Sequence, residues 1–244
     1  MKAPGPGYKF ESEGANRSLI FIPPQGENSM FIRLFMRGPA MDEARGDPSL
    51  SRALLADDFP PSGNLTAPQQ IHGTEVIAAS ERTVLPARPK ADGVYLKKTG
   101  TEASLRFADC FPVVVASNFP SPWITLLHSG YKGVVQNIAG KTCRELFERA
   151  GAEPSRTWAW IGPGISQKHY FRKKGEPWTD RGVKTFHGDN LKEEGEAIYF
   201  DLGSEIRRQL QDAGLEKGMI STIPLCTFQD YDVCYSYRKG DRES

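Results

Sequence analysis

Short runs of apolar residues, separated by glycine, proline and polar turns, recur along the chain and predict a protein rich in β-strands. The predicted strands are SLIFIPPQ, SMFIRLFM, QQIHGTEVIAA, the run after the glycine turn of ADGVYLKK, ASLRFA, PVVVAS, WITLLH, TWAWIGPGI and MISTIP. None of these runs approaches the roughly 20 apolar residues that a membrane-spanning helix needs.

Two segments have the 3.6-residue periodicity of amphipathic helices. The first covers residues 134–150, and in the second, DLGSEIRRQLQDAGL, the side chains of Leu202, Ile206 and Leu210 share one face before Gly214 ends the helix. Consecutive strands outnumber strand–helix–strand units. The pattern therefore predicts an α+β fold, a layered α/β sandwich of mixed β-sheets with flanking helices.

Three segments lack a clear pattern. Residues 1–16 are rich in Gly, Pro and charge and predict a flexible N-terminus. Residues 37–66 predict a long loop with one short helix around residues 50–58, and residues 167–195 are charged and predict irregular structure. Because no linker follows residue 66, we expect residues 17–244 to form a single domain.

The composition is that of a soluble globular protein, with 244 residues, 25% of them charged, and a net charge of +1. This balance gives no argument for nucleic acid or a membrane surface as a partner. The first residues have no apolar core of a secretory signal, so we expect a cytoplasmic protein whose four cysteines are reduced. Monomer and homodimer both remain open.

Three residues that suit metal binding stand at predicted strand ends. His72 precedes Gly73, Cys110 separates two apolar runs, and His128 ends WITLLH. One thiolate and two imidazoles are a natural ligand set for zinc, and three protein ligands leave a fourth position for water or substrate. Their spacing, 38 and then 18 residues, matches no short zinc motif. Packed side chains, or a metal-free Cys-His nucleophilic dyad, are the alternatives from the residues alone.

Two further motifs carry groups that can bind anions. HSGYKG places Gly130 and Lys132 before a predicted helix, where backbone N–H groups favour negative charge. CYSYRKGDR supplies Arg238 and Arg242, with Tyr235 or Tyr237 able to stack on a base or sugar. Taken singly, the first motif is better explained by an ordinary Gly-rich turn between strand and helix, and the second by a strand with a solvated basic end.

Together these segments resemble a known family. QQIHG, ADG, FADCFPVVV, HSGYKG, WIGPGI and CTFQDYDVCYSYR, in this order, resemble the bacterial laccase-domain or polyphenol-oxidase family of YfiH-like proteins, also described as purine nucleoside phosphorylases. The resemblance covers about residues 65–242. Its most specific parts are residues 70–73, 108–112, 128–133 and 236–238.

The resemblance implies a function. By position, His72, Cys110 and His128 correspond to the family's zinc ligands and catalytic residues. The implied activity is phosphorolysis of adenosine, inosine and methylthioadenosine, with adenosine deamination as a second activity, and zinc as the cofactor. The partners would be a purine nucleoside and phosphate, held by Gly130, Lys132 and Arg238.

Asp92 and Asp109 are candidates for orienting a ligand histidine or for acid–base chemistry. The family's turn carries Trp-Arg where this chain has Tyr131-Lys132, and Lys lacks the bidentate fork that Arg offers phosphate. In the N-terminal third, Arg33, Arg37 or Arg45 is expected to supply the arginine that the family places there.

The laccase name raises copper as an alternative metal. A multicopper oxidase needs several His-x-His pairs, and this chain has four histidines and no such pair. A single Cys/His₂ site binds Cu²⁺ in vitro because copper outranks zinc in intrinsic affinity. A copper-binding polyphenol oxidase, a metal-free Cys-His hydrolase or amidase, and a catalytically weak nucleoside-binding protein are therefore the alternatives to the zinc enzyme.

Overall fold

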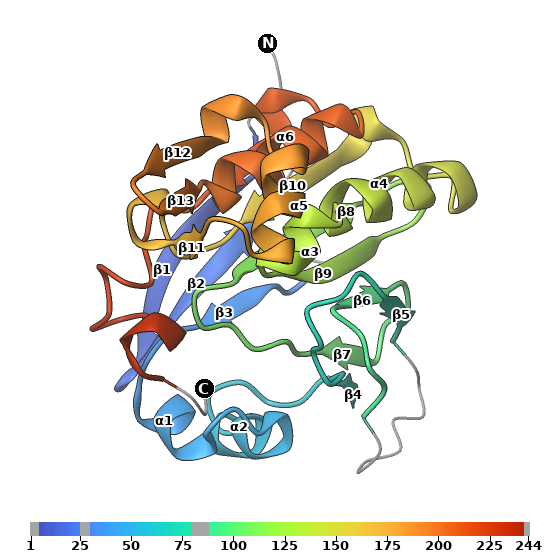
Figure 1. The fold of residues 1–244 in the computed structure, drawn as a ribbon. Coiled ribbons are helices and arrows are strands. Elements are labelled where there is room, and N and C mark those ends of the chain that lie inside the picture. Colours follow the sequence, from blue (N-terminus) through green and yellow to red (C-terminus); the bar gives the residue numbers. More distant parts are fainter. Residues whose placement is uncertain (1–4, 25–29, 80–87, 242–244) are drawn as a thin grey trace.

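A six-stranded mixed sheet runs through the centre of the molecule, as the computed structural model shows for residues 5–24, 30–79 and 88–241 (Figure 1). Its strand order is β14-β10-β8-β9-β6-β5. The strands are β5 (Val76–Ala78), β6 (Gly93–Leu96), β8 (Phe111–Ser117), β9 (Trp123–Ser129), β10 (Thr157–Ile161) and β14 (Ile220–Thr222). These strands match the predicted runs, with β8 and β9 each extending one residue beyond them, and the predicted layered α+β fold is confirmed.

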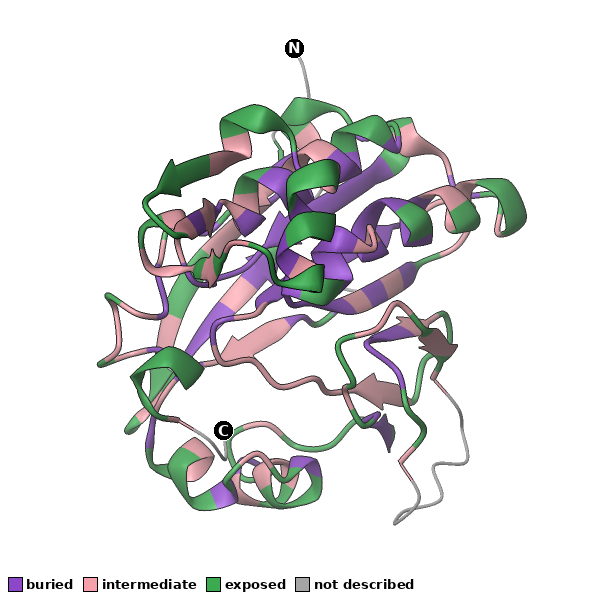
Figure 2. Cartoon of the chain, viewed as in Figure 1, coloured by how far each residue is buried: buried purple, intermediate pink, exposed green. Residues whose placement is uncertain are grey.

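Both faces of the sheet are covered, which explains why the central strands are continuous apolar runs rather than alternating ones. Along β8, Val113 and Val115 join the core on the helical side, while Val114 and Ala116 join the core on the opposite side. β10 divides its side chains in the same way. Figure 2 shows this buried centre as a continuous purple band.

Four helices and a small antiparallel sheet, ordered β11-β13-β12, cover one face (Figure 1). The helices are α3 (Tyr131–Val135), α4 (Ile138–Arg149), α5 (Pro177–Thr185) and α6 (Leu202–Asp212), and the strands are β11 (Phe171–Lys173), β12 (Leu191–Glu194) and β13 (Ala197–Phe200). The prediction of α6 is confirmed. The single helix predicted for residues 134–150 is wrong in part, because Asn137 adopts φ 61° and begins a second helix.

The segment 167–195 is also more ordered than its sequence indicates. It contains β11, α5 and β12, together with short 3-10 turns. More than half of its residues are exposed and many are charged, so few apolar positions remain to mark a helix or strand. Packing against the helical face organises this segment instead.

The other face is covered by an antiparallel sheet of β1 (Gly7–Glu13), β2 (Asn16–Ile22) and β3 (Arg33–Phe35). β1 pairs with β2 from Gly7 to Glu13, so the expectation of a flexible N-terminus over residues 1–16 is wrong for this segment. Residues 1–4 lie outside the described residues. Leu19 and Phe21 of β2, within the predicted strand SLIFIPPQ, reach the core beside Trp160.

Residues 37–66 form more structure than the predicted loop. They contain α1 (Pro39–Ala44), α2 (Pro48–Leu54) and β4 (Asn64–Thr66), which pairs in parallel with β7 (Thr101–Ala103). Asp47 caps α2 by accepting a hydrogen bond from the Leu50 N–H. The helix predicted around residues 50–58 therefore begins earlier than expected.

Two predicted strands are replaced by loops at one edge of the central sheet. In QQIHGTEVIAA only Val76–Ala78 is a strand, and residues 71–75 form a turn and loop. In ASLRFA, residues 104–107 have no regular structure. These loops meet the start of β6, the start of β8 and the end of β9, so residues far apart in sequence converge there. Among the described residues, no helix has the length and apolar character needed to cross a membrane.

Candidate metal centre

His72, Cys110 and His128 meet at this edge of the sheet. Their ligand atoms all lie within 4.8 Å of one another. A tetrahedral zinc ion with one thiolate and imidazole ligands separates those atoms by about 3.3–3.8 Å, so the cluster is close to the size that such a site needs. His128 is buried, Cys110 is half-buried and His72 is exposed, so the cluster opens to the surface on the His72 side.

Asp92 shapes the loop that carries His72. Its carboxylate, fully buried, accepts hydrogen bonds from the backbone N–H groups of Ile71 (3.1 Å), His72 (2.9 Å) and Gly73 (2.6 Å). His72 itself adopts φ 59°, a left-handed conformation that costs energy in a residue with a side chain. Three hydrogen bonds to one charge offset that cost and hold the loop in place.

The same carboxylate orients the second histidine. His128 Nδ1 lies 2.8 Å from Asp92 Oδ1, and the His128 backbone N–H donates to the Asp92 carbonyl. A hydrogen bond from Nδ1 to the carboxylate leaves Nε2 as the nitrogen that faces the cluster. Burial acts to raise the pKa of Asp92, but the hydrogen bonds from His128 and Gly73 outweigh it and keep the pKa below its usual range. Asp92, one of the two candidates from the sequence, therefore orients His128, one of the three candidate metal ligands.

The Cys110 thiol is poised to ionise. Burial acts to raise its pKa, yet hydrogen bonds with His128 and His72 lower the pKa to about 7. Burial acts to lower the pKa of His128, but its hydrogen bonds with Asp92 and Cys110 raise it to about 9. The thiolate is the form of cysteine that binds metal or attacks an electrophile, so both chemistries are open to this residue.

Gly130 provides the space that the cluster needs. A Cβ at this position would lie 2.7 Å from Cys110 Sγ and 2.9 Å from His72 Cδ2. No side chain fits there without moving a ligand. Gly130 is also the residue before α3, which has only five residues.

Asp109, the other candidate aspartate, has a different position. It is buried with φ 76°, and its carboxylate accepts hydrogen bonds from Thr227 Oγ1 and from the Arg238 backbone N–H, each at 2.8 Å. Its carbonyl accepts from the Ile165 N–H. Asp109 thus ties the Cys110 corner to two other segments of the chain and makes no contact with the ligand histidines among its hydrogen bonds.

The predicted cations lie on aromatic rings near this corner. Lys132 is exposed with its Nζ 5.2 Å from the centre of the Trp178 ring. Arg238 is exposed, donates to the Phe171 carbonyl and lies 5.1 Å from the centre of the Tyr170 ring. Both side chains are therefore accessible to an anion from solvent.

The N-terminal arginines have other partners. Arg33 donates to Ser18 and lies over the Phe59 ring, and Arg37 lies between the rings of Tyr231 and Tyr235 and pairs with Asp241. Arg45 forms the left-handed C-cap of α1. Neither Arg33 nor Arg37 has a contact with the cluster in the described residues. Arg242 lies outside the described residues.

Two residues that pack against Tyr131, the residue after Gly130, were missed by sequence reasoning. The ring centre of Tyr170 lies 5.5 Å from that of Tyr131, and burial raises the pKa of Tyr170. Arg172 lies over the Tyr131 ring and is held by Thr179 and Glu176. Their segment carries no apolar periodicity, so only the tertiary fold reveals them.

The other histidines lie elsewhere. His169 stacks on Phe228, and His187 is exposed at the start of a 3-10 turn. All four histidines and four cysteines are among the described residues, and they form one cluster of three ligand atoms. Cys143 is fully buried in α4, as expected for a packing residue, and Cys234 is buried but lies in a turn rather than in the expected strand. The ligand set suits one metal ion and does not suit several.

Comparisons with known proteins agree with the family resemblance. The model of a family described as multi-copper polyphenol oxidoreductase laccase matches residues 44–244. A purine nucleoside phosphorylase from Xylella fastidiosa strain 9a5c is 29% identical over 187 residues, covering 71% of this chain and 66% of the relative. Purine nucleoside phosphorylase YlmD from Bacillus subtilis is 30% identical over 149 residues, covering 61% of this chain and 53% of the relative. The chain thus aligns with just over half to two thirds of the length of these relatives.

Solved structures show the same fold over nearly the whole chain. Bacillus licheniformis YfiH, described as a hypothetical protein, superposes with a TM-score of 0.79 at 19% identity, covering 96% of this chain and 94% of that one. YlmD from Geobacillus stearothermophilus superposes with a TM-score of 0.75 at 22% identity, covering 97% and 95%. The matched residues, the fold and the converging motifs together show that this chain belongs to the laccase-domain family of YfiH-like proteins.

Proposed function

We propose that this protein is a zinc-dependent purine nucleoside phosphorylase acting on adenosine, inosine and methylthioadenosine. The observation that carries the proposal is the convergence of His72, Cys110 and His128 around one point, with Asp92 orienting both histidine-bearing segments. Relatives named purine nucleoside phosphorylase support the choice of reaction.

His72, Cys110 and His128 would hold the metal. When bound, zinc supplies a Lewis acid that polarises an oxygen or lowers the pKa of water at its open position. Asp92 keeps the His128 ring oriented, and Gly130 leaves the ligands room to close on the ion.

The chain's own residues would position phosphate and nucleoside. Lys132 and Arg238, both exposed, would hold the anion. A phosphate oxygen would bond to the ribose anomeric carbon as the glycosidic bond to the base breaks; the bonding pair passes to the base nitrogen, which takes up a proton. Asp109 holds the Arg238 backbone beside the Cys110 corner and is proposed as a positioning residue.

Adenosine deamination is proposed as a second activity of the same centre. The exposed His72 side leaves room for water as well as for phosphate. Water would add to the purine carbon that bears the amino group, and ammonia would leave. An assay that follows ammonia and free base separately distinguishes the two reactions.

A metal-free Cys-His hydrolase is the second candidate, and one observation favours it. The pKa of Cys110 is lowered to about 7 by its histidine contacts, as a nucleophilic thiol requires. A dyad keeps its activity in the presence of a chelator and loses it when iodoacetamide alkylates Cys110. A zinc enzyme loses activity on chelation and regains it when zinc is returned.

The test of the proposal combines metal analysis with turnover of adenosine and inosine. We expect about one zinc per chain and loss of base release by a factor of at least about 10³ in Cys110→Ala. The matched control is Cys143→Ala, which removes another buried thiol but keeps the cluster. Absence of stoichiometric zinc with unchanged activity in Cys110→Ala would refute the proposal. Tight nucleoside binding without release of base or ammonia would instead identify a nucleoside-binding protein. Bound copper together with oxidation of phenols would identify a polyphenol oxidase.

A further inference from the structure

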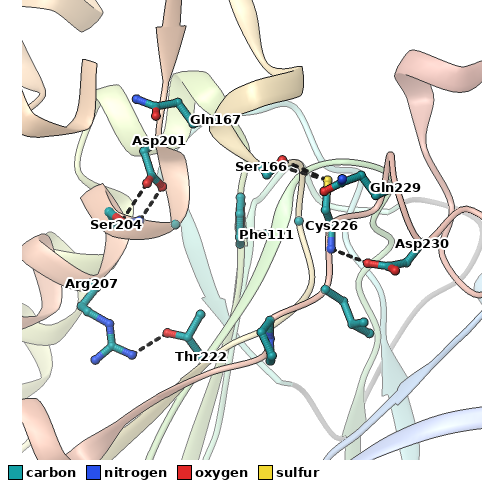
Figure 3. Close-up of a pocket in the computed structure, with 14 residues that line it drawn as sticks. Phe111, Ser166, Gln167, Asp201, Ser204, Arg207, Thr222, Cys226, Gln229 and Asp230 are labelled. Carbon is teal, nitrogen blue, oxygen red and sulfur yellow. Dashed lines mark hydrogen bonds between the residues drawn. The ribbon is translucent and has the colours of Figure 1, made fainter. Parts of the chain in front are cut away.

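A second cavity lies beside the N-terminal end of α6 and is separate from the metal cluster (Figure 3). Its volume is about 550 Å³, and none of the three metal-ligand candidates lines it. We propose that this cavity binds a neutral polyhydroxylated ring, a furanose or pyranose, either as a free sugar or as the sugar of a nucleoside. The proposal is independent of the metal and of the reaction assigned to it.

Phe111 separates the cavity from the cluster. It follows Cys110 in the chain, and its ring is held between Gly164 and Gly203, where an added Cβ would lie 2.4 Å and 3.3 Å from the ring. Pro224 and Leu225 add apolar surface on another side. A sugar ring has apolar C–H faces that suit such a surface.

The polar lining offers both donors and acceptors. The side-chain amides of Gln167 and Gln229 make no hydrogen bond to any of the residues that the structure describes; Figure 3 shows Gln229 beside the Ser166–Cys226 pair and Gln167 beside Asp201. Each amide presents an N–H donor and a carbonyl acceptor. A hydroxyl group is also donor and acceptor at once, so polyols satisfy such a lining better than a purely accepting anion does.

The charges of the lining also disfavour an anion. Arg207 is the one cation among the lining residues, which also include two carboxylates, Asp201 and Asp230. Arg207 donates one hydrogen bond, to Thr222 Oγ1 at 2.5 Å, and keeps further N–H groups for a ligand. Asp230 uses Oδ2 to accept from the Cys226 N–H, which leaves its Oδ1 as an acceptor. Adjacent hydroxyls of a sugar can accept from a guanidinium and donate to a carboxylate.

The walls are held in place before any ligand arrives. The Ser166 N–H donates to Cys226 Sγ at 3.3 Å, and the Thr227 N–H donates to the Gly164 carbonyl at 3.2 Å. Asp201 caps α6 by accepting from both the N–H and the hydroxyl of Ser204. A preformed cavity lowers the entropy cost of binding a small ligand.

The test uses ligand-detected NMR and calorimetry on the full chain with three probes: methyl β-D-ribofuranoside, inosine and adenine. We expect methyl riboside and inosine to bind and adenine alone not to bind at this cavity. Gln229→Trp, which fills the mouth, and Arg207→Met, which removes the cation, should each weaken methyl riboside binding about tenfold or more. Arg149→Met, a surface arginine on α4 outside the cavity, is the matched control.

Cys110→Ala separates this site from the metal centre. Methyl riboside binding that survives Cys110→Ala and falls in Gln229→Trp supports the proposal, whether or not the chain binds zinc. Binding that is lost in Cys110→Ala and unchanged in both cavity variants assigns the sugar to the metal centre and overturns it. Absence of methyl riboside binding at roughly 10 mM, or competition by inorganic phosphate for the cavity, overturns it as well.

Discussion

The loop that carries His72 and the corner that carries Cys110 use the same local device in different ways. Each has a non-glycine residue in the left-handed region, His72 at φ 59° and Asp109 at φ 76°, and each depends on a buried aspartate. In the first loop the carboxylate belongs to Asp92, on a neighbouring strand end, and in the corner it belongs to Asp109 itself. Strained residues of this kind persist where surrounding contacts over-determine them.

The difference lies in what each carboxylate holds. Asp92 accepts from three loop N–H groups and from the His128 ring, so it contacts both segments that carry candidate histidine ligands. Asp109 accepts from Thr227 and Arg238, so it joins chain segments without contacting a ligand histidine. Proximity to a candidate ligand is therefore a poor guide to function; the groups that the carboxylate contacts decide it.

The largest effect is expected for Asp92→Asn. The substitution keeps the shape of the side chain but turns a charged acceptor into an amide with one N–H₂ group facing loop donors. We expect zinc affinity to fall about 10–100-fold and the free energy of unfolding to fall by roughly 3 kcal/mol. Chelator competition and urea unfolding measure the two quantities. Asp189→Asn, at a side chain that is 92% exposed, is the control and should change neither.

Gly130→Ala should affect the ligands more than the fold. The added Cβ would sit 2.7 Å from Cys110 Sγ, a distance that forces the thiol or the backbone to shift. We expect zinc affinity to fall about tenfold with a loss of unfolding free energy of about 1–2 kcal/mol. Gly188→Ala is the control because a Cβ at that position meets no atom within 4 Å. Equal zinc affinity in the two variants would show that the cluster tolerates the added methyl group.

The sequence predicts those strands and helices that have a clear pattern of apolar residues within their own segment. β8, β9 and β10 are continuous apolar runs, and α6 repeats Leu202, Ile206 and Leu210 on one face. α5 and β11 were missed because they contain few apolar residues: the buried positions of α5 are Thr179 and Gly182, and β11 is the three residues FRK. The local signal fails where tertiary packing decides the structure.

The candidate site likewise has residues that the sequence predicts and residues that only the fold reveals. Residue chemistry indicates a cluster of His72, Cys110 and His128, but their separation in sequence matches no local motif, and the family resemblance supplied the order. The strand predicted through QQIHG was wrong, because the hydrogen bonds to Asp92 favour a turn over a strand at His72. Nothing local indicates that Asp92, 20 residues away, holds that turn.

Asp109→Asn should lower the free energy of unfolding slightly and leave the zinc affinity nearly unchanged. Asparagine tolerates the left-handed conformation, so the substitution removes the charge with little added strain. We expect a loss of unfolding free energy of about 1–2 kcal/mol, from weaker hydrogen bonds to Thr227 and Arg238. Zinc affinity should stay within about threefold. A loss of zinc affinity as large as that of Asp92→Asn would contradict the distinction between the two aspartates.

The smallest expected effect is on the pH dependence of Cys110 alkylation in the metal-free protein. The thiolate is the reactive form, and its pKa is lowered to about 7, so the rate of reaction with iodoacetamide should rise with pH and reach half its maximum near pH 7. Cys143 and Cys234, whose pKa values burial raises to about 12, are internal controls that stay unmodified over this range. Peptide mass spectrometry assigns the modified residue.

The two aspartate variants should separate again in this measurement. Asp92 stabilises the protonated His128 ring, and that ring in turn stabilises the Cys110 thiolate. In Asp92→Asn the ring gives up its proton at lower pH, the thiolate loses a positive partner, and the midpoint of alkylation should move upward by less than about one pH unit. In Asp109→Asn the midpoint should not move, because Asp109 has no hydrogen bond to either histidine. Equal midpoints in the two variants would mean that the charge of Asp92 does not affect the pKa of the Cys110 thiol. The role of Asp92 would then be limited to holding the His72 loop.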